Sequence, residues 1–164
     1  MTQSGRRHFV GLLVALSAAG CSTPKETAGT VAAGIRAWSG RLSVELETEP
    51  RQSFFAFFEL RGAADAGDLI LSGPLGNAIA SIRWTRTEAS LRVAETSRTF
   101  DSVETLIQTL TGAALPLGAV FAWLDGIDAN TGGWMADLSK IGQGRLLARR
   151  SSPEPVVNLK LIVD

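Results

Sequence analysis

The sequence has one histidine, His8, one cysteine, Cys21, and no tyrosine. Beyond residue 21 it therefore offers neither an imidazole nor a thiol. This excludes Ser-His and Cys-His catalysis, zinc sites with histidine or cysteine ligands, and disulfides from that part of the chain. Carboxylate chemistry remains open, but Glu45, Glu47 and Glu49 alternate as the solvated face of a strand does. We therefore predict a protein that is not an enzyme and holds no metal.

An excess of basic charge is also missing. Sixteen lysines and arginines are balanced by sixteen aspartates and glutamates, and the cations are scattered along the chain. Proteins that bind nucleic acid need a basic surface to neutralise phosphates, so we predict no nucleic-acid partner. A chain of 164 residues is long enough for one domain with a substantial core.

The first residues of the chain resemble an export signal. Arg6 and Arg7 supply a positive start, and the apolar run over residues 9–19 is too short to span a bilayer as a helix. Three small residues then lead into Cys21. We predict a signal peptide over residues 1–20. An ordinary secretory signal with an incidental cysteine is the alternative interpretation.

A lone cysteine after an apolar run and small residues resembles the lipobox of bacterial lipoproteins. By that resemblance, Cys21 is lipidated on sulfur and its amino group is acylated after cleavage, although Ala18 stands where leucine is usual. Ser22 implies sorting to the outer membrane, with the protein anchored by lipid and facing the periplasm. We expect residues 21–34 to be a lipidated N-terminus and flexible tether, and residues 35–164 to be the folded domain.

Strand patterns begin the folded domain. Apolar and polar residues alternate over 40–48, which predicts a half-buried strand. The strand expected over 53–60 carries phenylalanines on both faces, so its second face needs cover from another element or a ligand. Shorter strands are predicted over 68–72, 78–85, 91–94, 98–100, 134–138, 144–150 and 156–163.

The hydrophobic period changes to that of a helix in the middle of the chain. An apolar stripe runs from Val103 to Leu110, with Asp101 as the expected N-cap and Gly112 as the expected end. A second helix is expected to begin near Pro116. Strands, then two helices, then strands predict an α+β fold, an antiparallel barrel-like domain of about nine strands.

The stretch Gly73-Pro74-Leu75-Gly76-Asn77 separates the third and fourth expected strands. Glycine, proline and asparagine form turns readily, whereas leucine does not. Either Leu75 folds back onto the core, or it contacts a membrane or a partner.

Together with the lipobox, several segments resemble the LolB family of outer-membrane lipoprotein receptors, in order and in spacing. The most specific is residues 69–76, Leu-Ile-Leu-Ser-Gly-Pro-Leu-Gly. The others are Trp38-Ser39-Gly40-Arg41-Leu42, Phe57-Phe58, Leu110-Thr111-Gly112, Leu115-Pro116-Leu117, Trp123-Leu124-Asp125-Gly126 and Gly133-Trp134.

The resemblance implies an incomplete β-barrel with helices that cover or plug an apolar cavity. It implies that the protein takes acylated lipoproteins from the periplasmic carrier LolA and inserts them into the inner leaflet of the outer membrane, without a cofactor. The membrane-facing loop residue of the family maps onto Leu75, flanked by Pro74 and Gly76. We expect a monomer.

An acyl chain that leaves one protein for another needs a second apolar cavity. The candidate lining residues are large apolar side chains, namely Trp38, Phe54, Phe58, Trp84, Val103, Leu106 and Phe121. Each of them is equally suited to an ordinary core. The alternative function is therefore a lipid-anchored structural or scaffold protein of the periplasm with a filled core and no transfer activity.

Overall fold

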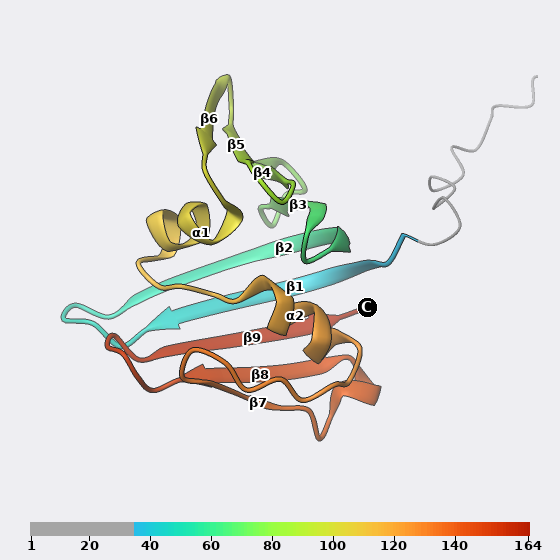
Figure 1. Cartoon of the computed structure of the whole chain (residues 1–164), viewed down its shortest axis with the longest axis vertical. Helices are drawn as coiled ribbons and strands as arrows, with labels where there is room; N and C mark the ends of the chain where they lie inside the picture. The colour runs from blue at the N-terminus through green and yellow to red at the C-terminus, as the bar shows by residue number, and fades with distance from the viewer. Residues whose placement is uncertain (1–34) are drawn as a thin grey trace, which may run out of the picture. The chain divides into compact units, whose positions relative to one another are not determined.

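The computed structural model describes residues 35–164 (Figure 1). The predicted signal peptide and tether, including Cys21, lie outside the described residues. Within residues 35–164, no helix is both long enough and apolar enough to cross a membrane.

Nine strands form one antiparallel sheet in the order β6-β5-β4-β3-β2-β1-β9-β8-β7. Because β6 and β7 are edges that do not pair with each other, the sheet stays open, and the predicted α+β fold with an incomplete barrel is confirmed. The strands are β1 (Ala37–Leu46), β2 (Gln52–Ala63), β3 (Ala66–Ser72), β4 (Ala78–Trp84), β5 (Ala89–Val93), β6 (Thr96–Phe100), β7 (Trp134–Asp137), β8 (Arg145–Arg150) and β9 (Val157–Val163).

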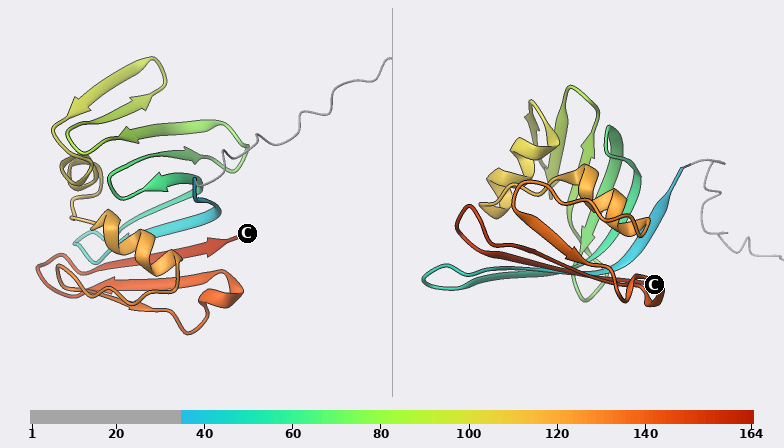
Figure 2. Two further views of the ribbon diagram at one scale, coloured as in Figure 1. Left: turned by 45° about the vertical axis from the view of Figure 1, so that its right-hand side comes forward. Right: turned by 60° about the horizontal axis from the view of Figure 1, so that its bottom comes forward.

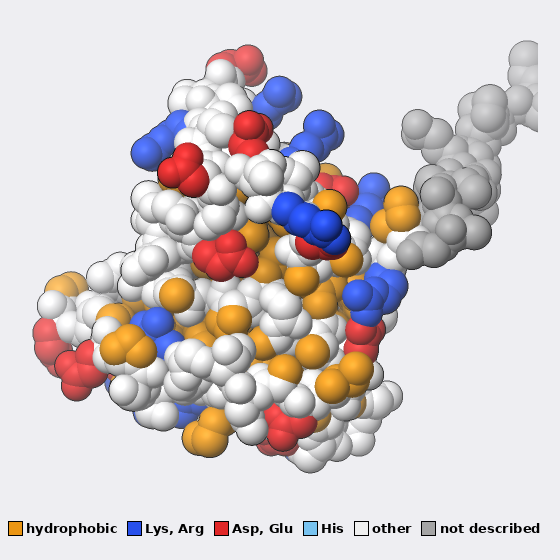
Figure 3. Space-filling model, in the orientation of Figure 1, with side chains coloured by type: hydrophobic (Ala, Val, Ile, Leu, Met, Phe, Trp, Pro, Cys, Tyr) orange, Lys and Arg blue, Asp and Glu red, His pale blue; other side chains and the backbone are white. Residues whose placement is uncertain are grey.

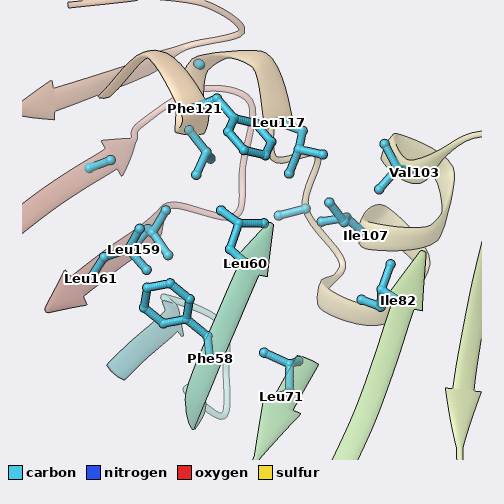
Figure 4. Close-up of a cluster of buried hydrophobic side chains, with 14 of the residues drawn as sticks. Phe58, Leu60, Leu71, Ile82, Val103, Ile107, Leu117, Phe121, Leu159 and Leu161 are labelled. Carbon is cyan, nitrogen blue, oxygen red and sulfur yellow. The ribbon is translucent and has the colours of Figure 1, made fainter. Parts of the chain in front are cut away.

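The sheet has an inner face, which carries the helices, and an outer face (Figure 2). Alternation decides which side chains face inward: Leu42 of β1 lies opposite Ala56 of β2 and Leu161 of β9 on the inner face. The same parity places Phe58 beside Leu71 of β3. The core therefore forms between the inner face of the sheet and the two helices (Figure 4).

Helix α1 (Val103–Thr111) begins one residue later than expected. Ser102, not Asp101, is the N-cap, and its Oγ accepts a hydrogen bond from the Thr105 backbone N–H at 3.1 Å. Both residue types cap helices well, so the choice follows from the phase that turns the apolar stripe inward. Gly112 ends the helix as predicted, with φ of 70° and its N–H bonded to the carbonyl of Gln108.

Helix α2 (Leu117–Leu124) is buried on nearly every side. Pro116 is its N-cap rather than its first turn. The ring of Phe121 packs edge-on against Trp38 of β1, with centroids 5.5 Å apart. Arg36 forms an ion pair with Asp125 at the end of the helix and lies over the Trp38 and Phe121 rings. A short 3-10 turn, η1 (Ile141–Gln143), precedes β8.

The β1–β2 hairpin extends past the end of β3. The pairing of β2 with β3 starts at Phe57 opposite Ser72, whereas the pairing of β2 with β1 starts at Gln52 opposite Leu46. Residues 52–56 therefore have a partner strand on one side only, and we call this segment the free edge of β2. The right-hand view of Figure 2 shows the hairpin projecting from the sheet.

Candidate apolar ligand site

A cavity of about 120 Å³ lies between the inner face of the sheet and the helices. Figure 4 shows side chains from both layers converging on this interior. Its lining is aliphatic and aromatic apart from one threonine, and comprises Leu42, Val44, Phe54, Phe58, Leu60, Leu69, Leu71, Ile82, Ile107, Leu110, Thr111, Leu115, Leu117, Val120, Leu159 and Leu161. No charged side chain lines it, so the space suits an apolar ligand.

A second space of about 300 Å³ adjoins this cavity, and we call it the mouth groove. The two spaces share Val44, Phe54, Leu71, Leu110 and Thr111 in their linings. The rim of the mouth groove includes apolar side chains that are exposed to solvent, among them Ile79, Val93 and Leu110. Hydrophobic side chains also gather on the helix-bearing side in Figure 3. The interior is thus continuous with an apolar opening.

The seven predicted cavity residues divide into two groups. Phe54 and Phe58 line the cavity, and Phe54 also lines the mouth groove. The other five do not line either space and lie in or against the core around them: Trp38, Trp84, Val103, Leu106 and Phe121. Trp38 and Trp84 both pack their rings against Phe121, with centroids 5.5 and 6.4 Å away. These large rings fill space by packing on one another.

Most of the aliphatic wall of the cavity was not among the residues predicted from the sequence. The alternation over residues 40–48 marks Leu42 and Val44 as inward-facing and could have found them. Leu159 and Leu161 of β9 also line the cavity, because β9 pairs with β1. That pairing joins the two ends of the domain and leaves no local signal in the sequence.

The loop between β3 and β4 is a tight turn with an exposed tip. The Gly73 N–H donates to the Asn77 carbonyl at 2.9 Å, and the Gly76 N–H donates to the Gly73 carbonyl at 2.9 Å. Gly76 has φ of 78°, a backbone conformation that favours glycine. Leu75 is 93% exposed, so its side chain does not fold back onto the core.

Charged groups of the domain lie outside the cavity. Glu47, after β1, accepts hydrogen bonds from Asn158 at 3.0 Å and from Arg149 at 2.8 Å. These two donors hold the pKa of Glu47 below its ordinary value. Across the described domain, no cluster of three or more histidine, cysteine, aspartate or glutamate residues is arranged to hold a metal ion.

The fold is an open antiparallel sheet with an apolar cavity and a connected groove, the kind of space that suits an apolar ligand. The chain also matches the family model described as "Outer membrane lipoprotein LolB" over residues 36–154. It therefore belongs to the LolB family, which serves lipoprotein localisation at the outer membrane and not catalysis. A search of curated proteins gave no match.

Proposed function

We propose that this protein accepts acylated lipoproteins from a LolA-type periplasmic carrier and inserts them into the inner leaflet of the outer membrane. The observation that carries this proposal is the apolar cavity with its connected mouth groove. Burial of each methylene of an acyl chain contributes roughly 0.8 kcal/mol. A chain passing between two proteins therefore needs an apolar path throughout, and Phe54 stands where the mouth groove meets the cavity.

The proposal also assigns roles to Cys21 and Leu75. Cys21 carries the lipids that hold the protein, as a monomer facing the periplasm, on the outer membrane. Leu75, between Pro74 and Gly76, touches the bilayer. Burying one leucine contributes roughly 1.5–3 kcal/mol, which is too little to hold a protein on a membrane. Leu75 therefore orients the mouth groove toward the bilayer, while the lipids on Cys21 provide the anchor.

The alternative of a lipid-anchored scaffold protein needs a filled interior. The interior instead holds an apolar cavity, and Leu75 is exposed. Both observations support transfer over a purely structural role.

A transfer assay tests the proposal. A LolA-type carrier is loaded with a lipoprotein labelled in its acyl chains and is mixed with a chain that starts at residue 22 and therefore lacks the anchor. We expect the label to move to this chain. Val44→Trp should reduce the movement, because Val44 lines both the cavity and the mouth groove.

The matched control is Thr99→Trp, which places the same bulk at an exposed position on β6. It should leave the movement of label unchanged. Failure of the unmodified chain to take any label from the carrier would contradict the proposed function. Equal transfer of label by Val44→Trp and Thr99→Trp would show that the cavity does not take part in transfer.

A further inference from the structure

The outer face of β2 carries two phenylalanines that no element of the described domain covers. Phe55 and Phe57 are 52% and 40% exposed, and their rings meet edge-on with centroids 6.0 Å apart. The sequence predicted that this face needs cover from another element or a ligand. An aromatic pair that stays this exposed indicates a contact surface.

Two exposed cations lie on the β1 side of the aromatic pair. Arg41 lies directly opposite Phe57 on the neighbouring strand β1. Lys160 of β9 lies opposite Ser43, which in turn lies opposite Phe55. Neither Arg41 nor Lys160 forms an ion pair with any residue from 35 to 164. Both side chains are exposed.

Three acidic residues of β1, β2 and the β1–β2 turn are engaged by arginines. The ion pairs are Glu45 with Arg51 at 3.0 Å, Glu59 with Arg61 at 3.1 Å, and Glu47 with Arg149 at 2.8 Å. These three carboxylates therefore do not neutralise Arg41 and Lys160, which stay available beside the aromatic pair. Aromatic rings next to free cations match the interface of a bilayer that contains anionic phospholipids, since rings enter the headgroup region and cations bind phosphates.

The patch is continuous with the loop between β3 and β4. Phe57 lines a depression of about 360 Å³ together with Gly73, Pro74 and Gly76 of that loop. In the right-hand view of Figure 2 the loop extends past β1 and β2 on the side opposite the helices. The loop tip and the aromatic pair therefore present to the same side of the molecule.

We propose that Phe55, Phe57, Arg41 and Lys160 form a surface that binds the anionic phospholipid bilayer. Together with the loop between β3 and β4, this surface places the outer face of β2 against the bilayer. This inference rests on the proposed function, because it supplies the route of delivery. The free edge of β2 separates Phe54 in the mouth groove from Phe55 on the outer face. An acyl chain that rounds this edge reaches the bilayer without crossing water.

Photo-cross-linking of the full chain, extracted from membranes and reconstituted into vesicles of phosphatidylethanolamine and phosphatidylglycerol, tests the proposal. A benzophenone amino acid replaces Ser43, between the aromatic pair and Lys160, and in a second protein it replaces Glu88. Glu88 is exposed at the end of β4 remote from the loop at 73–77, and therefore gives the background of chance collisions. We expect lipid adducts at position 43 at least about tenfold above those at position 88.

Two pairs of substitutions sharpen the test. Arg41→Glu with Lys160→Glu should lower the lipid adducts at position 43, since each cation near an anionic surface contributes roughly a fivefold factor. The matched reversal Arg83→Glu with Arg92→Glu, on exposed positions of β4 and β5, should leave the adducts unchanged.

Vesicles of phosphatidylcholine, which carries no net charge, should lower the lipid adducts at position 43 of the unsubstituted protein, as the Arg41→Glu and Lys160→Glu substitutions do. Equal lipid adducts at positions 43 and 88, or adducts at position 43 to a second copy of the chain in place of lipid, overturn the proposal. The transfer assay is independent: lipid contact at position 43 without transfer contradicts the proposed function alone, and transfer without this contact contradicts the surface alone.

Discussion

Gly67 and Trp84 face each other across the β3–β4 pair, with no space between the Gly67 backbone and the indole for a side chain. A Cβ at Gly67 would lie 2.5 Å from Cζ2 of Trp84 and 2.3 Å from the carbonyl oxygen of Arg61. The indole N–H also donates to the Ala63 carbonyl at 3.0 Å. Trp84 thereby ties β4 to the end of β2 beside the β2–β3 turn.

Gly67→Ala should lower the free energy of unfolding by about 1–3 kcal/mol, because the added methyl group overpacks a rigid site. Urea unfolding followed by tryptophan fluorescence measures the change. Gly142→Ala is the matched control, since a Cβ there meets no atom within 4 Å. It should alter the free energy by less than about 0.5 kcal/mol. Similar losses of unfolding free energy from the two substitutions would show that the contact with Trp84 does not exclude a side chain at position 67.

Ser102→Ala should lower the free energy of unfolding by about 1 kcal/mol, because it removes the hydrogen bond that caps α1. Asp101→Ala should change it by less than about 0.5 kcal/mol, because Asp101 does not cap the helix. Urea unfolding of both variants provides the comparison. A larger loss from Asp101→Ala would return the N-cap to the position expected from the sequence.

Leu75→Glu should leave acceptance of lipoprotein from the carrier intact but impair its delivery into liposomes. A carboxylate at the exposed loop tip resists entry into the bilayer, while the cavity lies elsewhere. Acceptance is measured by co-purification of label with the protein, and delivery by co-flotation of label with liposomes. Leu75→Met retains an apolar tip and should deliver normally. Normal delivery by Leu75→Glu would exclude a role for this leucine at the membrane.

Because of Glu47, the free energy of unfolding of the domain should depend on pH under acidic conditions. Hydrogen bonds from Asn158 and Arg149 lower the pKa of Glu47 in the folded state. A lowered folded-state pKa gives stability that is complete above the unfolded value of about 4.3, and that is lost as the pH falls through the folded value. The difference in unfolding free energy between wild type and Glu47→Gln should therefore be constant from neutral pH down to about 5.

Below about pH 5 the difference in unfolding free energy between wild type and Glu47→Gln should narrow. Urea unfolding at each pH measures it. In a protein that also carries Arg149→Gln, the effect of Glu47→Gln on the unfolding free energy at neutral pH should be smaller, because one of the two hydrogen-bond donors to Glu47 is gone. A difference that widens in acid would contradict the assigned direction of the pKa shift.

Local patterns predicted the strands and their faces, but not the walls of the site. Leu42 and Val44 follow from simple alternation, and both line the cavity. Leu159 lines it only because β9 pairs with β1, a contact that depends on the whole sheet. Trp84 and Phe121 were predicted to line the cavity for their size, yet they pack closely together. Open space in this interior is bounded mainly by aliphatic side chains, which the sequence does not distinguish from ordinary core.

The loop shows the same limit in another form. The sequence placed Leu75 at a turn, but it left open whether the side chain folds back. The hydrogen bonds within Gly73–Asn77 close the turn and leave the tip beyond the reach of the core. The exposure of Leu75 is thus a property of backbone geometry, which residue types alone did not specify.

The free edge of β2 also bears on the solubility of the protein. Residues 52–58, Gln-Ser-Phe-Phe-Ala-Phe-Phe, have no charge and no proline, and over residues 52–56 the unpaired backbone offers hydrogen bonds to any other extended chain. Arg51 and Glu59 flank this segment as charged gatekeepers. Copies concentrated in solution are expected to pair edge to edge and aggregate, whereas a lipid surface that covers the segment would suppress fibril formation.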